Sequence, residues 1–140
     1  MQTKYAFPAV FTSEEEGGYS VYFPDISGCY TDGDTLTEAI EMAKDALCLM
    51  LYHLEERGEA IPHASDIKAV SAAIADNEFV SLIACDTLDY RRYYDNKAVK
   101  KTLSIPSWLN VLAEREGVNF SAVLQNALKR ALGIETKIEY

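Results

Sequence analysis

Between residues 99 and 105, a largely apolar set (Val99, Lys101, Leu103 and Ile105) alternates with a polar set until Pro106 ends the pattern. Alternation with a period of two is typical of a β-strand that has one apolar and one polar face. Proline lacks the backbone N–H that a sheet requires, so the predicted strand ends there. The residues that follow have helical periodicity, and the strand therefore has no partner strand in its own part of the chain.

Two short amphipathic helices are predicted after this strand. Ser107 and Asn119 are suitable N-cap residues, and Gly117 and Gly133 are suitable C-terminal stops. A module of roughly 40 residues with one unpaired strand buries too little surface to be stable alone. We therefore predict a homodimer in which two strands pair antiparallel and four helices pack beneath them, and a dimer of dimers remains open. The apolar stripes of the two predicted helices are Trp108, Leu109, Leu112 and Ala113, and then Phe120, Val123, Leu124, Ala127, Leu128, Ala131 and Leu132.

The charge is divided unequally along the chain. The 140 residues have a net charge of -9. Residues 1–96 contain 6 Lys and Arg against 18 Asp and Glu, a net charge of -12, whereas residues 97–140 contain 7 against 4, a net charge of +3. An acidic body is therefore joined to a mildly basic tail, and each part needs its own interpretation.

The sequence pattern of residues 1–96 predicts the element order β-β-β-α-β. Thr35 and Glu38 form a capping box ahead of a long amphipathic helix that Gly58 ends. Pro8 indicates that the first strand lies at a sheet edge or contains a bulge. Residues 60–77 give no clear pattern. The predicted strands are residues 5–12, 19–23, 29–31 and 79–85.

These elements predict an α+β fold in which the long helix covers the sheet. A polar, tyrosine-rich segment then separates the two parts of the chain. We predict an N-terminal domain over residues 1–88, a linker over residues 89–97 and a C-terminal domain over residues 98–140.

The strand-helix-helix pattern at the C-terminal end resembles the ribbon-helix-helix repressors. In that group a two-stranded ribbon enters the major groove of DNA and its outward side chains read base edges. The resemblance implies that Lys100, Thr102 and Ser104 face operator DNA. It also implies that Asn119 and Ser121, at the start of the second helix, contact a phosphate.

A series of motifs in the first half resembles the HicB antitoxin family. That family pairs a partial ribonuclease-H-like domain with a C-terminal DNA-binding domain, so the resemblance extends over both parts of the chain. It implies that the chain binds and inhibits a HicA-like, mRNA-cleaving toxin and represses its own operon. The motifs, in order, are residues 7–11 (FPAVF), 18–25 (GYSVYFPD), 28–29 (GC), 33–35 (GDT) and 38–39 (EA).

The acidic charge of the N-terminal domain fits such a toxin, because a protein that cleaves RNA needs a basic surface to bind phosphates. Turns that follow strands often carry binding residues. We therefore expect Asp25, Ser27, Asp32 and Asp34 to contact the toxin, and we interpret residues 14–16 as a solvated turn.

An enzyme is not expected. A ribonuclease-H-like nuclease needs several carboxylates that converge on divalent metals, and Asp34 and Asp45 lie before and within the long helix. His53 and His63 have no nearby partners that suggest a triad. No metal site or cofactor is predicted. The alternative function is a ribbon-helix-helix repressor whose N-terminal domain senses a small ligand.

Three widely spaced cysteines, with no metal-binding spacing, favour a reduced and cytoplasmic protein. The N-terminus has no apolar stretch of signal-peptide length, and the longest apolar run, residues 46–52, is too short to span a bilayer. We therefore expect a cytoplasmic chain without a membrane partner.

Overall fold

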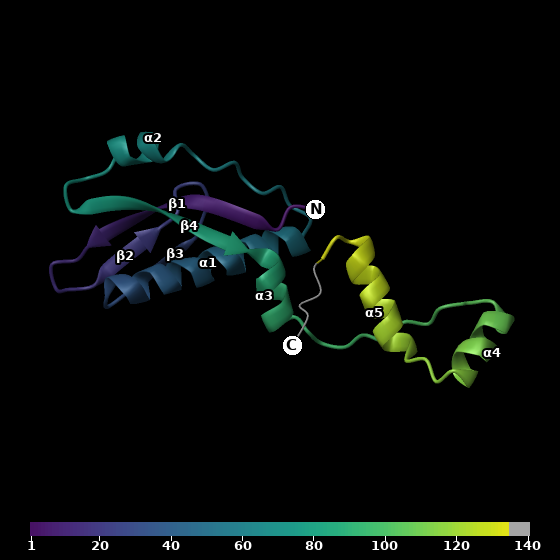
Figure 1. The fold of residues 1–140 in the computed structure, drawn as a ribbon. Helices are drawn as coiled ribbons and strands as arrows, with labels where there is room; N and C mark the ends of the chain where they lie inside the picture. Colours follow the sequence, from purple (N-terminus) through teal and green to yellow (C-terminus); the bar gives the residue numbers. More distant parts are fainter. Residues whose placement is uncertain (135–140) are drawn as a thin grey trace. The chain divides into compact units, whose positions relative to one another are not determined.

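A computed structural model describes residues 1–134 as two compact units (Figure 1). The first unit comprises residues 1–98, and the second begins at Val99.

The first unit is built on one antiparallel sheet of four strands in the order β3-β2-β1-β4. The predicted hairpin is confirmed, because β1 pairs with β2 from Val10 opposite Tyr22 to Ser13 opposite Tyr19. The β4 strand pairs with β1 along nearly its whole length. The strands are β1 (Lys4–Ser13), β2 (Tyr19–Tyr22), β3 (Tyr30–Gly33) and β4 (Glu78–Asp86).

The long helix α1 (Leu36–Glu56) covers one face of the sheet, as predicted. The side chain of Thr35 accepts a hydrogen bond from the backbone N–H of Glu38 at 3.1 Å, which confirms the N-cap. The apolar stripe of α1, with Leu47 and Leu51 completely buried, packs on the inward side chains of the sheet, such as Phe7 and Phe11. The core of the first unit lies between these two layers.

Gly33 allows α1 to start directly against the sheet. A Cβ atom at this position would lie 2.7 Å from the Cα of Ala39, in the first turn of the helix. Real Cβ atoms do not approach backbone this closely, so the contact requires glycine. The sequence motif around Gly33 therefore has a packing reason.

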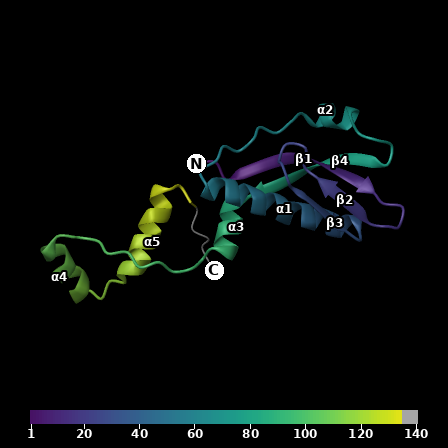
Figure 2. The same cartoon turned by 180° about the vertical axis from the view of Figure 1, so that it is seen from behind.

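The opposite face of the sheet is covered by the chain between α1 and β4. This stretch contains the short helix α2 (Ile67–Ala72), and Figures 1 and 2 both show α1 and α2 on opposite sides of the sheet. Pro8 and Val10 alternate along β1 with the residues that face α1, so they point to the opposite face of the sheet. Both are buried, so the centre of this second face is also shielded from solvent.

The prediction that Pro8 marks an edge strand is wrong for the strand as a whole, because β1 lies between β2 and β4. The registers supply the physical reason. Pro8 pairs with Leu82 of β4, but β2 pairs with β1 only from Val10 onward. At Pro8 the strand therefore has a partner on one side only, and a residue without an N–H is tolerated there.

A helix occupies most of the segment that the sequence analysis treats as a linker. Helix α3 (Thr87–Tyr94) begins after Asp86, whose carboxylate accepts the backbone N–H of Leu88 at 3.0 Å. Arg91 forms ion pairs with Glu55 and Glu56 at the end of α1, and its guanidinium lies over the ring of Tyr52. The tyrosines and charges of this segment thus attach α3 to α1.

The second unit contains two helices, α4 (Ser107–Arg115) and α5 (Phe120–Ala131). Asn119 caps α5, as predicted, by accepting the backbone N–H of Ala122 at 3.1 Å. Ser107 does not cap α4. Pro106 occupies the N-cap position, has no side-chain hydrogen bond to offer, and accepts the N–H of Asn110 through its carbonyl oxygen at 3.1 Å.

The strand predicted over residues 99–105 is not formed in the single chain, in which these residues have no regular structure. The physical reason is the absence of a partner strand in the described part of this unit, because an isolated strand leaves its backbone groups to water. The glycine stops are confirmed: Gly117 and Gly133 have positive φ angles of 65° and 70°.

Candidate interaction sites

Asp25 holds the chain that crosses the sheet. Its carboxylate accepts the backbone N–H of Ser65 at 2.9 Å and also the Ser65 hydroxyl. This contact joins the turn after β2 to the end of the extended segment 59–66, which we call the strap. Asp25 was predicted to face a partner, and the structure gives it an internal structural role as well.

Ser27, Asp32 and Asp34 are all exposed. Ser27 lies at the tip of a tight loop that follows β2, and Asp34 lies between β3 and α1. Asp32 lies within β3, opposite Ser20 of β2. The structure therefore places the predicted residues at both ends of the β2–β3 hairpin, because Ser27 lies in the loop that joins the two strands and Asp34 follows the far end of β3.

Asp32 shares a shallow hollow of about 380 Å³ with two exposed tyrosines. Tyr22 and Tyr30 are directly opposite each other in the β2–β3 register, and Val21, which precedes Tyr22 in β2, is buried toward α1. The hollow thus lies on the face of the sheet opposite α1. Aromatic rings beside a carboxylate form a surface that suits lysine and arginine side chains.

Sequence reasoning missed the two tyrosines of this hollow. The signal for Tyr22 was present, because Ser20 and Tyr22 alternate with apolar residues and must face away from the core. The position of Tyr30 required the β2–β3 register, which the sequence did not fix, since β3 runs two residues further than predicted.

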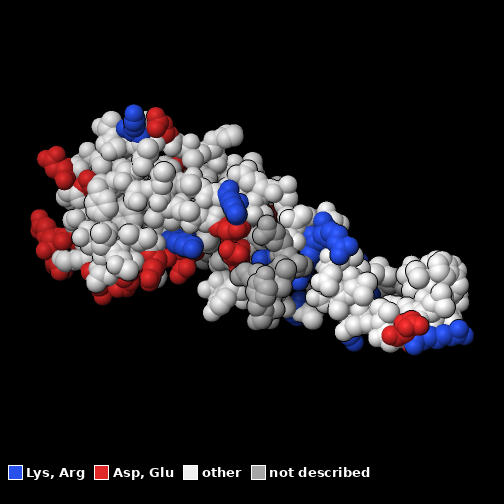
Figure 3. All heavy atoms as spheres, in the orientation of Figure 1, with Lys and Arg blue, Asp and Glu red and all other residues white. Residues whose placement is uncertain are grey.

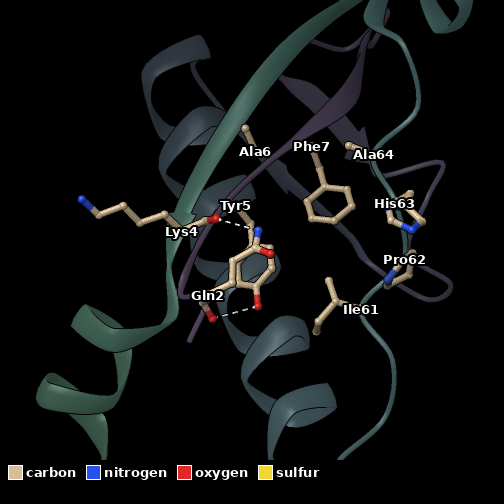
Figure 4. Close-up of a pocket in the computed structure, with 9 residues that line it drawn as sticks. All are labelled: Gln2, Lys4, Tyr5, Ala6, Phe7, Ile61, Pro62, His63 and Ala64. Carbon is tan, nitrogen blue, oxygen red and sulfur yellow. Dashed lines mark hydrogen bonds between the residues drawn. The ribbon is translucent and has the colours of Figure 1, made fainter. Parts of the chain in front are cut away.

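A second cleft, of about 280 Å³, lies between the start of β1 and the strap (Figure 4). Phe7 and Tyr5 of β1 face Ile61 and His63 of the strap across it. Burial and the nearby Glu55 carboxylate raise the pKa of Tyr5, so its hydroxyl keeps its proton. This hydroxyl can donate to the carbonyl oxygen of Gln2 at 3.2 Å and to the carboxylate of Glu55 at 3.4 Å.

Charge is divided between the units on the face that Figure 3 shows. Acidic side chains gather over the first unit, at the β1–β2 turn and along the side of the sheet that carries α1, whereas basic side chains predominate in the second unit. The predicted asymmetry of the sequence is therefore also an asymmetry of the surface.

The residues predicted to contact DNA are exposed. Lys100, Thr102 and Ser104 lie in the irregular segment before α4, and Ser121 lies in the first turn of α5 beside the cap residue Asn119. The single chain does not bring the two groups together on one strand-and-helix surface, because the predicted ribbon requires a second copy of the segment.

The apolar stripes of α4 and α5 are uncovered in the single chain. No residue of either helix is buried, and Trp108 and Leu128 retain 65% and 52% of their accessible surface. A helix pair of this composition normally buries its stripe. The second unit thus presents a large apolar surface that fits a partner of similar character.

Among residues 1–134, no group of three or more His, Cys, Asp and Glu side chains could hold a metal ion. Within the same residues, no helix is long and apolar enough to cross a membrane.

An acidic α+β unit followed by a helical unit with an uncovered apolar stripe defines a modular interaction protein. The sequence matches the family described as "HicB_like antitoxin of bacterial toxin-antitoxin system" over residues 7–126, and the chain belongs to this family. The resemblance inferred from the motifs of the first half is thereby confirmed.

Curated relatives match the first part of the chain. Antitoxin HicB 1 of Photorhabdus laumondii is 48% identical over 56 residues, which are 40% of this chain and 36% of that protein. Antitoxin HicB of Escherichia coli K12 is 41% identical over 63 residues, which are 45% of this chain and 46% of that protein. The chain thus spans less than half the length of these relatives.

Solved structures share the fold over most of the chain. A chain of the "Toxin-Antitoxin complex from Streptococcus pneumoniae" has a TM-score of 0.59 and 27% identity, covering 91% of this chain and 99% of that chain. The antitoxin HicB of Burkholderia pseudomallei has a TM-score of 0.53 and 23% identity, with coverages of 91% and 98%. The latter supports the fold alone.

Proposed function

We propose that the chain is an antitoxin that binds and inhibits a HicA-like, mRNA-cleaving toxin through its first unit and represses its own operon through its second unit. The observation that carries the proposal is the HicB-like family match, which extends from the first strand into α5. The charge and the exposed surfaces of the two units support the division of labour.

In the first unit, the hollow on β2 and β3 is the surface that best fits a basic partner. Tyr22 and Tyr30 can stack on guanidinium or ammonium groups, and Asp32 can pair with them. Ser27 and Asp34 are exposed at the two opposite ends of the same hairpin. Such a surface competes with RNA phosphates for the cations that the toxin uses to bind its substrate.

In the second unit, dimerisation would complete the DNA-binding surface. Two copies of segment 99–105 would pair as an antiparallel ribbon, and α4 and α5 of both chains would cover their apolar stripes. Lys100, Thr102 and Ser104 would then lie on the outer face of the ribbon. Asn119 and Ser121 would flank it with the free N–H groups of the first turn of α5.

The toxin-binding half of the proposal is tested with full-length variants. Tyr30→Ala combined with Asp32→Asn should weaken binding of the purified toxin by at least about tenfold, in line with the loss of one stacking contact and one charged contact per chain. The measurement is titration of ribonuclease inhibition. Glu15→Gln, in the β1–β2 turn, is the matched control and should bind as wild type. Equal loss in the control would assign the effect to net charge.

The DNA-binding half is tested with Thr102→Ala combined with Ser104→Ala. A hydrogen bond contributes about 0.5–1.5 kcal/mol and a dimer would lose four hydroxyls, so operator affinity should fall by at least about tenfold while toxin inhibition is unchanged. Lys68→Ala in the first unit is the control, because it removes a cation distant in sequence from the ribbon. A double variant that also loses toxin inhibition would contradict the division of labour.

The alternative, a ligand-sensing repressor, would use the cleft between β1 and the strap. That cleft has about 280 Å³, at the lower limit of the volumes usual for small-molecule sites. A tagged chain that retains a small basic ribonuclease during purification from its host would favour the antitoxin. Purification without any such partner, together with operator binding that responds to a metabolite extract, would favour the sensor.

A further inference from the structure

Two of the three cysteines meet in the core of the first unit. Cys48 of α1 and Cys85 of β4 are both buried, and their sulfur atoms are 2.6 Å apart. Cys29 is also buried, but it lies in the loop before β3, and its thiol has no hydrogen-bond partner among those that the structure gives. Cys48 and Cys85 therefore differ from Cys29, because each of their sulfur atoms is in contact with another sulfur atom.

The environment of the pair favours Cys48 as the reactive thiolate. The contact with Cys85 lowers the pKa of Cys48 most, and burial opposes it. The ammonium of Lys44, one helical turn away, and the backbone N–H of Asp86 also lower this pKa, whereas Asp45 raises it. The hydrogen bond between the two thiols lowers the pKa of Cys48 and raises that of Cys85. In the neutral pair the Cys48 thiol donates to the Cys85 sulfur. When Cys48 is ionised, Cys85 keeps its proton and becomes the donor.

We propose that Cys48 and Cys85 form a redox modification site, at which a hydroperoxide converts the two thiols into an intramolecular disulfide. Geometry carries this assignment: the sulfurs come from different elements, lie in contact, and need only a small shift to reach the length of a disulfide bond. Metal binding does not account for the pair, because no third ligand lies beside it in the described residues.

The chemistry balances with one hydroperoxide per chain. The Cys48 thiolate attacks one peroxide oxygen, the O–O bond breaks, and a sulfenic acid forms on Cys48 with release of hydroxide. The Cys85 sulfur then attacks the Cys48 sulfur and displaces the hydroxyl group, which leaves as water with the Cys85 proton. Two thiols lose two electrons, the peroxide gains them, and with hydrogen peroxide two molecules of water are formed.

The disulfide would tie helix α1 to the edge strand β4. It would close a loop that contains the whole strap and α2, and it would form one residue before Asp86, which caps α3. Closing a loop of this length restricts the unfolded chain, so the unfolding midpoint of the first unit should rise by about 10–20 °C. An oxidised antitoxin would therefore open less often and resist proteolysis longer than the reduced protein.

Helix α3 lies beside the pair. Tyr90 of α3 packs on the core beside Cys48, and Arg91 holds α3 to α1 through Glu55 and Glu56. A peroxide reaches the sulfurs when α3 moves away. Arg91→Ala should therefore speed disulfide formation at least about threefold without changing the site.

The experiment treats the full-length chain with hydrogen peroxide and follows intact mass and linked peptides. We expect a loss of two mass units, a Cys48–Cys85 peptide that dithiothreitol separates, and a higher unfolding midpoint. Cys29→Ser is the matched control and should behave as wild type, whereas Cys48→Ser and Cys85→Ser should each abolish the mass loss and the midpoint shift.

Other products would overturn the proposal. Oxygen addition to Cys48 without a crosslink, or a disulfide between two chains, would show that the pair does not close. A Cys48–Cys85 crosslink that forms without raising the unfolding midpoint would show that the disulfide does not stabilise the first unit. Because the serine variants could unfold, their far-ultraviolet circular dichroism is recorded first. If they are unfolded, alkylation of the oxidised and the reduced wild type decides the question, since protection of both cysteines after oxidation is required.

Discussion

Replacing Leu128 in α5 by alanine tests whether the apolar stripe of the second unit is a dimer interface. Leu128 lies on the same side of α5 as Phe120 and Leu124, at spacings of four residues. It retains 52% of its accessible surface in the single chain. A dimer that covers the stripe would bury this remaining half, and the substitution would remove that gain from both chains.

The expected magnitude follows from the exposed fraction. Leucine exceeds alanine by three carbon groups, worth roughly 2.4 kcal/mol on full burial, so the half that association buries contributes about 1.2 kcal/mol per chain. Two chains per dimer lose about 2.4 kcal/mol, which corresponds to a roughly 50-fold increase in the dimer dissociation constant.

Analytical ultracentrifugation over a dilution series measures this constant. Asn126→Ala is the control, because residue 126 lies on the opposite side of α5 from residues 124 and 128. Circular dichroism establishes that the helices persist in both variants. A dissociation constant for Leu128→Ala within about threefold of wild type would refute the reasoning, and the stripe would then need another partner.

Three further predictions concern the first unit. Gly33→Ala should lower the free energy of unfolding by about 3 kcal/mol, because its Cβ would enter the first turn of α1. Gly28→Ala is the control: it has open space around it and a φ of 75°, so the loss should be only about 1 kcal/mol. Urea unfolding of both variants measures the difference. Asp25→Ala should lower the free energy of unfolding by about 1–2 kcal/mol and increase hydrogen exchange in the strap, because Ser65 loses its acceptor. Unchanged exchange would show that Asp25 does not anchor the strap. Burial raises the pKa of Cys29 from 9.0 to about 11, so the folded thiol keeps its proton where the unfolded thiol loses it. Stability should therefore fall by about 2 kcal/mol more in wild type than in Cys29→Ser as pH rises from 9 to 11, and equal pH profiles would contradict this.

The order of elements in the first unit could be predicted because each has a strong local signal. The cap of α1 at Thr35 and its stripe of apolar residues are properties of adjacent residues, and the structure reproduces both. The position of β1 within the sheet could not be predicted, because it depends on where β2 stops pairing, a property of two strands together. The sequence indicated an edge position or a bulge at Pro8, and the structure shows a local edge there, because β2 pairs with β1 only from Val10 onward.

The candidate site was less predictable than the fold. Asp25 and Asp32 are both acidic residues near turns, and the sequence does not separate them. The structure directs Asp25 at Ser65 and leaves Asp32 beside two tyrosines, because a strap 40 residues further along the chain crosses the sheet. Helix α3 was missed for a similar reason: its tyrosines and charges look solvated in sequence, but Arg91 and Tyr90 pack on α1.

The carboxylate of Glu55 links segments that are far apart in the sequence. It accepts hydrogen bonds from the hydroxyls of Tyr5 at 3.4 Å and Thr87 at 3.0 Å, and it forms an ion pair with Arg91 at 3.5 Å. The start of β1, the end of α1 and the beginning of α3 therefore open together or remain closed together. Although α3 has only two turns, its amides should exchange with solvent only when these three segments open together, and a substitution that removes the Tyr5 hydroxyl should also speed exchange in α3.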